Sequence, residues 1–202
     1  MSRAVALRRA GGAGEEASSC VPQAFLYPEA LFSRDPAGEE AFWVCVRTRP
    51  RWEKKFAEWL KGRRRVFFLP VFRHETVSGR KRRVSELPLF PGFVFVAGDL
   101  AKKDFAQTGT VAYVLRPRGA EEAAQLGREL RNIWRGLSGG AYVAPVRNLA
   151  AGEACRIVGG PLQGVEARFE RRGRGGRLIL QVEILGGGVA VEVPPDEVEV
   201  IS

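Results

Sequence analysis

The segment from Glu86 to Val96 constrains this chain more than any other, because it joins two apolar runs through a Pro-Gly step. Pro91 fixes its own φ angle and Gly92 accepts dihedrals that other residues avoid, so the chain turns between the runs. The second run, residues 93–97, is rich in Phe and Val and is predicted to be a strand. Alternation along a strand points its Phe side chains one way and its Val side chains the other. Because one core cannot cover both faces, we expect one face to pack on helices and the other to form an apolar depression for a partner.

Apolar periodicity around this strand predicts the rest of an N-terminal domain. Trp52, Phe56 and Leu60 recur at helical spacing after a strand at residues 42–47, and Thr48 is expected to cap that helix at its start. Further strands are expected at residues 66–77, 82–87 and 111–115, and helices at 102–107 and 121–137. The charged turn after residue 77 makes a projecting basic hairpin. This order predicts a single mixed sheet backed by helices.

The remainder of the chain predicts three further regions. Residues 1–39 are expected to be disordered or partly docked, and residues 40–138 to form the N-terminal domain. Residues 139–150 contain Gly and Pro and are predicted to be a linker. Residues 151–202 hold five short strands separated by glycines, which is typical of a small closed β-barrel.

The excess positive charge of the chain lies in one region. The formal net charge is +9, and residues 40–140 hold 21 basic and 10 acidic side chains, while each flanking segment is close to neutral. A domain with that imbalance attracts phosphate polymers and loses affinity steeply with salt. The middle region is therefore a candidate for nucleic-acid binding; the alternative is an ordinary solvated surface.

Several classes of function find no support in the sequence. Three scattered cysteines match neither a disulfide framework nor a zinc site and suit a reducing cytoplasm. No apolar run is long enough to cross a membrane, and the N-terminus makes a poor secretory signal. The single histidine, His74, has no catalytic partners in the pattern, and the carboxylate pairs that a nuclease needs are scattered. We expect a cytoplasmic, monomeric protein that is not an enzyme and uses no cofactor or metal.

Two groups of motifs resemble the NusG family. The segments that carry the resemblance are 42–46, 48–50, 53–55, 67–70 and 86–96 in the N-terminal half, and 152–153, 156–158, 160–162 and 164–165 near the C-terminus. The first group resembles the NusG N-terminal domain and the second a KOW motif, in the order of the family. The resemblance implies an α+β protein with a mixed α/β sandwich followed by a five-stranded, SH3-like KOW β-barrel. It also implies a transcription elongation factor.

The resemblance assigns the apolar depression to RNA polymerase. It implies that the clamp helices of the largest polymerase subunit bind there, which favours the elongating state over the paused one. The predicted contact residues are Val46, Phe90, Phe93, Phe95 and Tyr113. Each of them has the alternative role of an ordinary core residue. Arg47 stands where relatives of the RfaH kind carry a tyrosine that makes this contact.

Two basic clusters lie where the resemblance implies contact with DNA or nascent RNA. The predicted nucleic-acid residues are Arg49, Arg51, Lys55, Arg63, Arg64, Arg65, Arg80, Lys81, Arg82 and Arg83. Guanidinium groups suit phosphate oxygens and guanine edges. The alternative for residues 63–65 is a favourable interaction with the helix dipole. Trp59 is either a stacking platform for a base or, by its helical phase, a core residue.

The predicted barrel carries the surface expected to recruit a second partner. Its residues are Gly160, Pro161, Leu162 and Leu185. Relatives use this surface for the termination factor Rho or a small-subunit ribosomal protein, but Leu185 replaces the usual Phe. Departures such as this one favour a specialised antiterminator of the UpxY or LoaP kind, with a housekeeping NusG-like factor or a ribosome-associated RNA-binding protein as alternatives. The Gly-rich turns favour a permanent barrel over one that refolds to helices.

Overall fold

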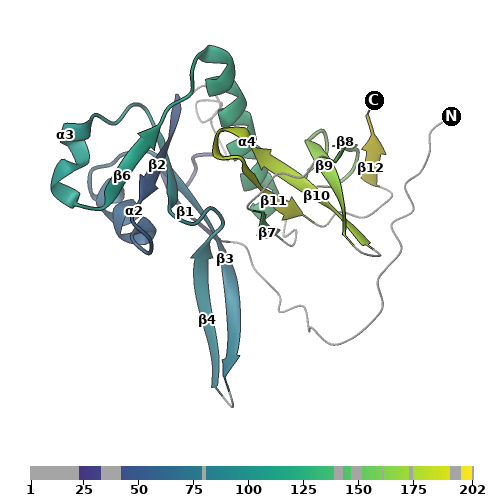
Figure 1. The fold of residues 1–202 in the computed structure, drawn as a ribbon, viewed down its shortest axis with the longest axis horizontal. Coiled ribbons are helices and arrows are strands. Elements are labelled where there is room, and N and C mark those ends of the chain that lie inside the picture. Colours follow the sequence, from purple (N-terminus) through teal and green to yellow (C-terminus); the bar gives the residue numbers. More distant parts are fainter. Residues whose placement is uncertain are drawn as a thin grey trace.

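The computed structural model describes residues 23–32, 42–78, 81–138, 143–146, 152–160, 162–172, 175–191 and 197–201. These residues form two antiparallel sheets and a few helices, an α+β fold (Figure 1). The long helix α4 (Ala120–Ser138) lies between the two sheets. The β3–β4 hairpin projects away from both of them.

The N-terminal sheet has six strands in the order β1-β3-β5-β2-β6, with β4 attached to β3. Their bounds are β1 Gln23–Tyr27, β2 Trp43–Thr48, β3 Phe67–Ser78, β4 Lys81–Pro88, β5 Phe93–Ala97 and β6 Val111–Leu115. Every pair among them is antiparallel, so the expectation of a mixed sheet is wrong. The sequence predicts where strands lie, but their direction depends on partners that are far apart in the chain.

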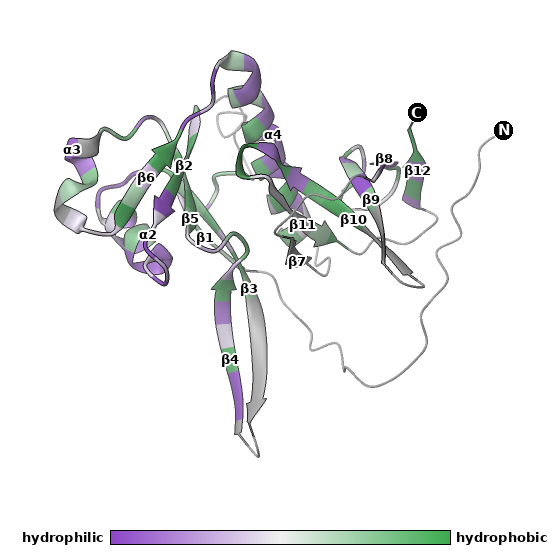
Figure 2. Ribbon diagram, in the orientation of Figure 1, coloured by the Kyte–Doolittle hydropathy of each residue, from purple (hydrophilic) through white to green (hydrophobic). Residues whose placement is uncertain are grey.

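Helices cover both faces of this sheet. On one face, α2 (Glu53–Gly62) and α3 (Lys102–Phe105) pack on the Val side chains of β2 and β5. On the other face, α4 packs on Trp43, Cys45 and Phe68 through its leucines and Ile133. Figure 2 shows polar and apolar residues alternating along α4, as expected for a helix with a buried stripe. The expectation that helices pack on one face of residues 93–97 is confirmed. The other face was expected to form an apolar depression, but α4 packs there as well and Phe95 is buried in its core.

The start of α2 differs from the sequence-based expectation. The helix begins at Glu53, and Thr48 is not its cap but the buried last residue of β2. The Thr48 N–H donates to the carbonyl of Gly92 (2.8 Å), which holds it in the sheet. Residues 49–52 form the turn into the helix, with the Trp52 N–H donating to the Arg49 carbonyl (3.1 Å).

Part of the N-terminal extension belongs to the folded domain. Strand β1 pairs with β3, and after it Leu31 is buried. The Phe32 ring stacks on Trp43 (6.0 Å between centroids) and on Trp134 of α4 (5.9 Å). Such aromatic pairs add to the stabilisation from burial, so this segment fixes α4 on the sheet. Residues 1–22 and 33–41 lie outside the described residues.

The C-terminal sheet has six antiparallel strands in the order β12-β8-β9-β10-β11-β7. Their bounds are β7 Val143–Val146, β8 Glu153–Ile157, β9 Glu166–Arg172, β10 Gly175–Val182, β11 Gly187–Val191 and β12 Val198–Val200. A short 3-10 helix, η2 (Glu183–Leu185), lies between β10 and β11, and another, η1 (Ala106–Thr108), follows α3 in the N-terminal half. The five strands expected after residue 150 are present. The structure differs at residues 143–146: they were expected in a linker but pair with β11 as a sixth strand. Pro145 suits this edge position, where a missing N–H is tolerated.

Helix α4 joins the two halves into one continuous apolar core. Leu126, Leu130 and Leu137 belong to the same buried cluster as Leu178 and Leu180 of β10. The helix and the C-terminal sheet pack closely at Gly136, where a Cβ would lie 3.6 Å from Leu180 and 3.8 Å from Leu162, at ordinary contact distance. A side chain much larger than alanine is expected to overpack this contact.

Candidate functional site

The Pro91-Gly92 turn is held from three sides. The Gly92 N–H donates to the buried carboxylate of Glu53 (2.7 Å), and its carbonyl accepts from Thr48. Gly92 has a φ of +83°, where a side chain is strained. The Arg47 guanidinium lies against the open side of the glycine, because a Cβ there would be 2.7 Å from its Cζ. The turn thus positions Arg47 and the first residue of β5.

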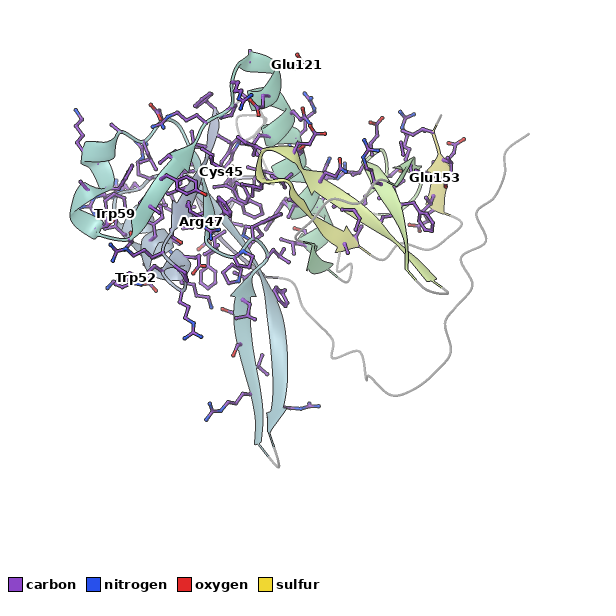
Figure 3. All side chains as sticks on the ribbon, viewed as in Figure 1. Cys45, Arg47, Trp52, Trp59, Glu121 and Glu153 are labelled. Atoms are coloured by element: carbon purple, nitrogen blue, oxygen red, sulfur yellow. The ribbon has the colours of Figure 1, made fainter. Side chains whose placement is uncertain are left out.

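A row of three side chains crosses the sheet beside this turn. Phe93 on β5, Arg47 on β2 and Tyr113 on β6 stand opposite one another in register. The Arg47 Cζ lies 4.7 Å from the centre of the Phe93 ring, and Nη1 donates to the Pro91 carbonyl (2.9 Å). Tyr113 is 50% exposed, while Phe93 and Arg47 are half-buried. We call these three residues the aromatic row; Figure 3 labels Arg47 at its centre.

The five residues predicted for polymerase binding occupy different environments. Phe93 and Tyr113 reach the surface as members of the aromatic row. Phe95 is buried against Phe90, with ring centroids 5.5 Å apart, and both belong to the core under α4. Val46 is buried on the opposite face with α2. In this structure only the first two can touch a partner directly, and the other three support the sheet beneath it.

Helix α2 carries an aromatic and basic surface on the side away from α4. Lys55 Nζ lies 4.3 Å from the centre of the Trp52 ring, which is 36% exposed. Arg63 Cζ lies 4.0 Å from the Trp59 ring, and that ring stacks on Phe56. Trp59 is thus partly core and partly a platform for a cation. Figure 3 labels both tryptophans on this side of the molecule.

The remaining predicted cations near α2 divide into exposed and engaged groups. Arg49, Arg51 and Arg64 are exposed. Arg65 is half-buried and donates from Nη2 to the Asp99 carbonyl (2.8 Å), so it ties the end of α2 to the loop after β5. Its Nε is buried without a hydrogen-bond partner among the described residues. The structure therefore gives Arg65 a structural contact, and the exposed three remain accessible to a ligand.

The β3–β4 hairpin carries the second predicted cluster. Arg82 and Arg83 are exposed and stand opposite Val77 and Thr76, so they point to opposite faces of the ribbon. Lys54 of α2 pairs with Glu86 at the base of the hairpin (2.9 Å). Arg80 and the Lys81 side chain lie outside the described part of the structure.

The surface predicted for the second partner lies against α4. Leu162 is only 4% exposed and belongs to the core shared with that helix, and Leu185 is half-buried at its margin. Gly160 is exposed and packs against Glu197. Pro161 lies outside the described residues. Of the predicted set, the central apolar residue is thus covered by the chain itself.

Polar contacts reinforce the cover over this surface. Arg135 of α4 donates to the Gln163 carbonyl (2.9 Å), and the Glu183 N–H donates to the Glu129 carboxylate (3.3 Å). A cleft of about 620 Å³ opens beside these contacts, lined by side chains of both charges. Burial raises the pKa of Glu129 to about 7, against the lowering effect of its hydrogen bonds from Glu183 and Gln125. No sequence pattern points to Glu129, because its environment depends on contacts between α4 and the C-terminal half of the chain.

The described residues offer little for covalent or metal chemistry. Burial raises the pKa of the Cys45 and Cys155 thiols above their usual value, which keeps them neutral. No group of three or more potential metal ligands occurs among the described residues. Within the same residues, no helix is long and apolar enough to cross a membrane.

The fold and its surfaces define a class of protein. The chain is an α+β protein whose distinctive side chains lie at surfaces: a cationic ribbon, a basic helix face and an aromatic row on a sheet. The family model described as transcription termination factor nusG matches residues 41–146, more than half of the chain. The chain belongs to the NusG family. No curated protein gives a significant match.

Membership of the family carries a coarse function. NusG proteins are non-enzymatic transcription factors that act in elongation and termination, and they bind RNA polymerase and nucleic acid. The matched residues include the whole aromatic row, helix α2 and the hairpin, and they end with β7. Segment 23–32 and strands β8 to β12 lie outside the match.

Proposed function

We propose that this protein is an elongation factor that binds RNA polymerase through the aromatic row and adjacent nucleic acid through α2 and the hairpin. On the polymerase, the clamp helices of the largest subunit are the proposed partner. Bound there, the protein suppresses pausing and termination on particular operons, as a specialised antiterminator. The observation that supports this best is an exposed aromatic patch on a sheet face that helices otherwise cover.

The proposed nucleic-acid surface is supported by its charge and its rings. Residues 40–140 carry a net charge of +11. Trp52, with Lys55 above it, and the exposed arginines offer a base-stacking face beside phosphate-binding groups. Such contacts position a strand without reading its sequence.

The C-terminal sheet is proposed to act as a KOW domain that recruits a second partner, either a small-subunit ribosomal protein or Rho. Its central residue in that role, Leu162, packs against α4. Recruitment through this residue therefore requires the C-terminal sheet to move off the helix. Buried apolar side chains contribute to an interface only when a partner replaces the contacts they lose.

In vitro transcription through a pause site and a terminator tests the proposal. Addition of the protein is expected to shorten the pause and increase read-through. Phe93→Asp places a charge in the aromatic row and is expected to abolish both effects and polymerase binding. Tyr113→Asp does the same at a more exposed position, so a folding defect in the first variant does not decide the result.

Val158→Asp is the matched control, because Val158 is a similarly exposed apolar residue outside the row. It is expected to keep full activity. The proposal is wrong if folded Phe93→Asp and Tyr113→Asp proteins bind core polymerase as tightly as the unmodified chain. Hairpin variants Arg82→Ala and Arg83→Ala are each expected to lower the salt dependence of binding to single-stranded DNA by about 0.7 in log-log slope.

A further inference from the structure

Arg47 places a positive charge in the aromatic row, and the packing of its aromatic neighbours does not require this charge. Among the described residues, its guanidinium donates one hydrogen bond, to the Pro91 carbonyl, and lies on the face of Phe93. No ion pair to Arg47 occurs among the described residues. An arginine carries five N–H donors, so most of its hydrogen-bonding capacity is directed elsewhere than to the described protein.

The surroundings of Arg47 hold it in place. The Gly92 backbone and the Phe93 ring contact two sides of the group, and Tyr113 stands opposite it on β6. The Glu53 carboxylate beside this turn is buried and accepts the Gly92 N–H, so it is already engaged. A guanidinium that is preorganised in this way loses little conformational freedom when it binds a carboxylate.

We propose that the aromatic row selects an acidic protein segment, in which one carboxylate pairs with Arg47 while apolar side chains contact Phe93 and Tyr113. The inference rests on the proposed polymerase binding and names the chemistry of the polymerase segment that binds. Charge complementarity favours this occupant, because a cation with no ion pair among the described residues lies between two aromatic side chains, in a region of net charge +11. Charge pairs of this kind set partner choice and association rate.

A nucleic acid fits the same row less well. Base stacking needs an open ring face, and the guanidinium of Arg47 already occupies one face of Phe93. A carboxylate needs only the free edge of the guanidinium, where it accepts two N–H bonds in parallel.

The experiment measures binding of the full chain to core polymerase, and separately to single-stranded DNA, over a range of salt concentrations. Arg47→Met keeps the apolar stem and removes the charge, and is expected to weaken polymerase binding about 10-fold. Arg47→Glu is expected to weaken it about 100-fold or more, since like charges then face each other. Arg118→Glu, at an exposed arginine outside the row, is the matched control and is expected to change the affinity little.

A charge reversal on the partner completes the test. Acidic residues of the polymerase clamp helices are changed to Arg one at a time, and one of these changes is expected to restore binding of Arg47→Glu at least 10-fold. The inference is overturned if Arg47→Glu binds polymerase normally while Phe93→Asp does not, a result that leaves the proposed function standing. Normal binding by both variants rejects the proposed function itself. A loss confined to DNA binding identifies a phosphate as the ligand and also overturns the inference.

Discussion

The two candidate protein-binding surfaces of this chain differ in whether α4 covers them. The aromatic row lies on the sheet face that α4 packs against, yet Tyr113 remains half exposed. Leu162, at the centre of the C-terminal surface, is buried by the same helix. Helix α4 leaves Tyr113 half exposed, while the C-terminal sheet packs closely against the helix at Gly136. One surface is therefore available at once, and the other only after a rearrangement.

This difference in exposure gives the two surfaces different conformational costs of binding a partner. A surface that is exposed in the resting structure can bind its partner without a conformational cost, whereas a covered surface binds with an affinity reduced by the fraction of open molecules. If the two surfaces act as proposed, polymerase is expected to bind first and the second partner later. The link between the two modules is then expected to raise the effective concentration of the second partner at the polymerase.

The largest expected effect comes from enlarging Gly136. A Cβ there would lie at ordinary contact distance, 3.6 Å from Leu180 and 3.7 Å from Val191, so a larger side chain is expected to overpack the contact. Gly136→Leu is expected to cost the helix–sheet contact about 1–3 kcal/mol by overpacking and to release the C-terminal sheet. Small-angle scattering then shows a larger radius of gyration, and Leu162 becomes accessible to a partner.

Gly136→Ala is the control for this change. It adds one methyl group at ordinary contact distances and removes the flexibility of a helical glycine, so it is expected to stabilise the protein by about 0.5–1 kcal/mol. The radius of gyration stays unchanged. If the leucine variant is as compact as the alanine variant, the closed contact is not controlled by Gly136.

The second prediction disturbs the exposed surface instead. Gly92→Ala forces a side chain into a left-handed conformation, which is expected to lower the free energy of unfolding by about 1–2 kcal/mol. It also pushes the Arg47 guanidinium off Phe93. Gly109 has a similar φ of +62° with open space around it, so Gly109→Ala carries only the strain.

The comparison of these two variants isolates the role of the row. Thermal unfolding is expected to place them close together, because the end of an arginine side chain can move out of the way of a methyl group. Polymerase binding is expected to fall only for Gly92→Ala. Equal affinities for the two variants contradict a role for the position of Arg47.

Local patterns predicted much of the fold because they are set by neighbouring residues. The Phe- and Val-rich strands at 93–97 and 111–115 have the expected bounds, and α4 extends one residue beyond its prediction at each end. Thr48 shows the opposite case. It has the chemistry of a helix cap, but its hydroxyl and its N–H both donate to the carbonyl of Gly92, a residue more than forty positions away.

Exposure was less predictable than secondary structure for the same reason. Alternation correctly places Phe93 and Phe95 on one face, yet only the first reaches the surface, because α4 and Phe90 cover the second. The sequence around Leu162 predicts a loop residue on a binding surface, but in the structure α4 packs against it and buries it. Which member of an apolar pattern is free depends on where a distant helix ends.

The third prediction tests the closed surface through its pH dependence. Burial by the C-terminal sheet raises the pKa of Glu129 from its ordinary value of 4.5 to about 7, and the Glu183 carboxylate adds to the shift while Arg128 opposes it. The closed form, in which the C-terminal sheet packs on α4, therefore binds the proton more tightly than the open form, in which the sheet is released. This proton stabilises the closed form fully below pH 4.5, and the stabilisation is lost as the pH rises through about 7.

Energy transfer between dyes on the two sheets measures this change. The fraction of closed molecules is expected to fall between pH 5 and pH 8, and Glu129→Gln is expected to remove most of the dependence because the amide does not titrate. The polymerase affinity of Gly136→Leu is expected to change less over the same range, because its C-terminal sheet is already released from α4. A pH response that is unchanged in Glu129→Gln rejects this residue as the cause.

The smallest expected effect concerns the hairpin beside the exposed row. Lys54 pairs with Glu86 at 2.9 Å and also lies 5.0 Å from the Phe25 ring, but both charged side chains are substantially exposed. A double-mutant cycle with Lys54→Met and Glu86→Gln is expected to give a coupling of about 0.2–1 kcal/mol that shrinks at high salt. Strand β4 is also held to β3 by the backbone hydrogen bonds of the hairpin, so loss of the ion pair is not expected to detach β4 from the sheet. A coupling well above this range, measured by urea unfolding, means that the ion pair and not the ladder fixes the direction of the hairpin relative to the row.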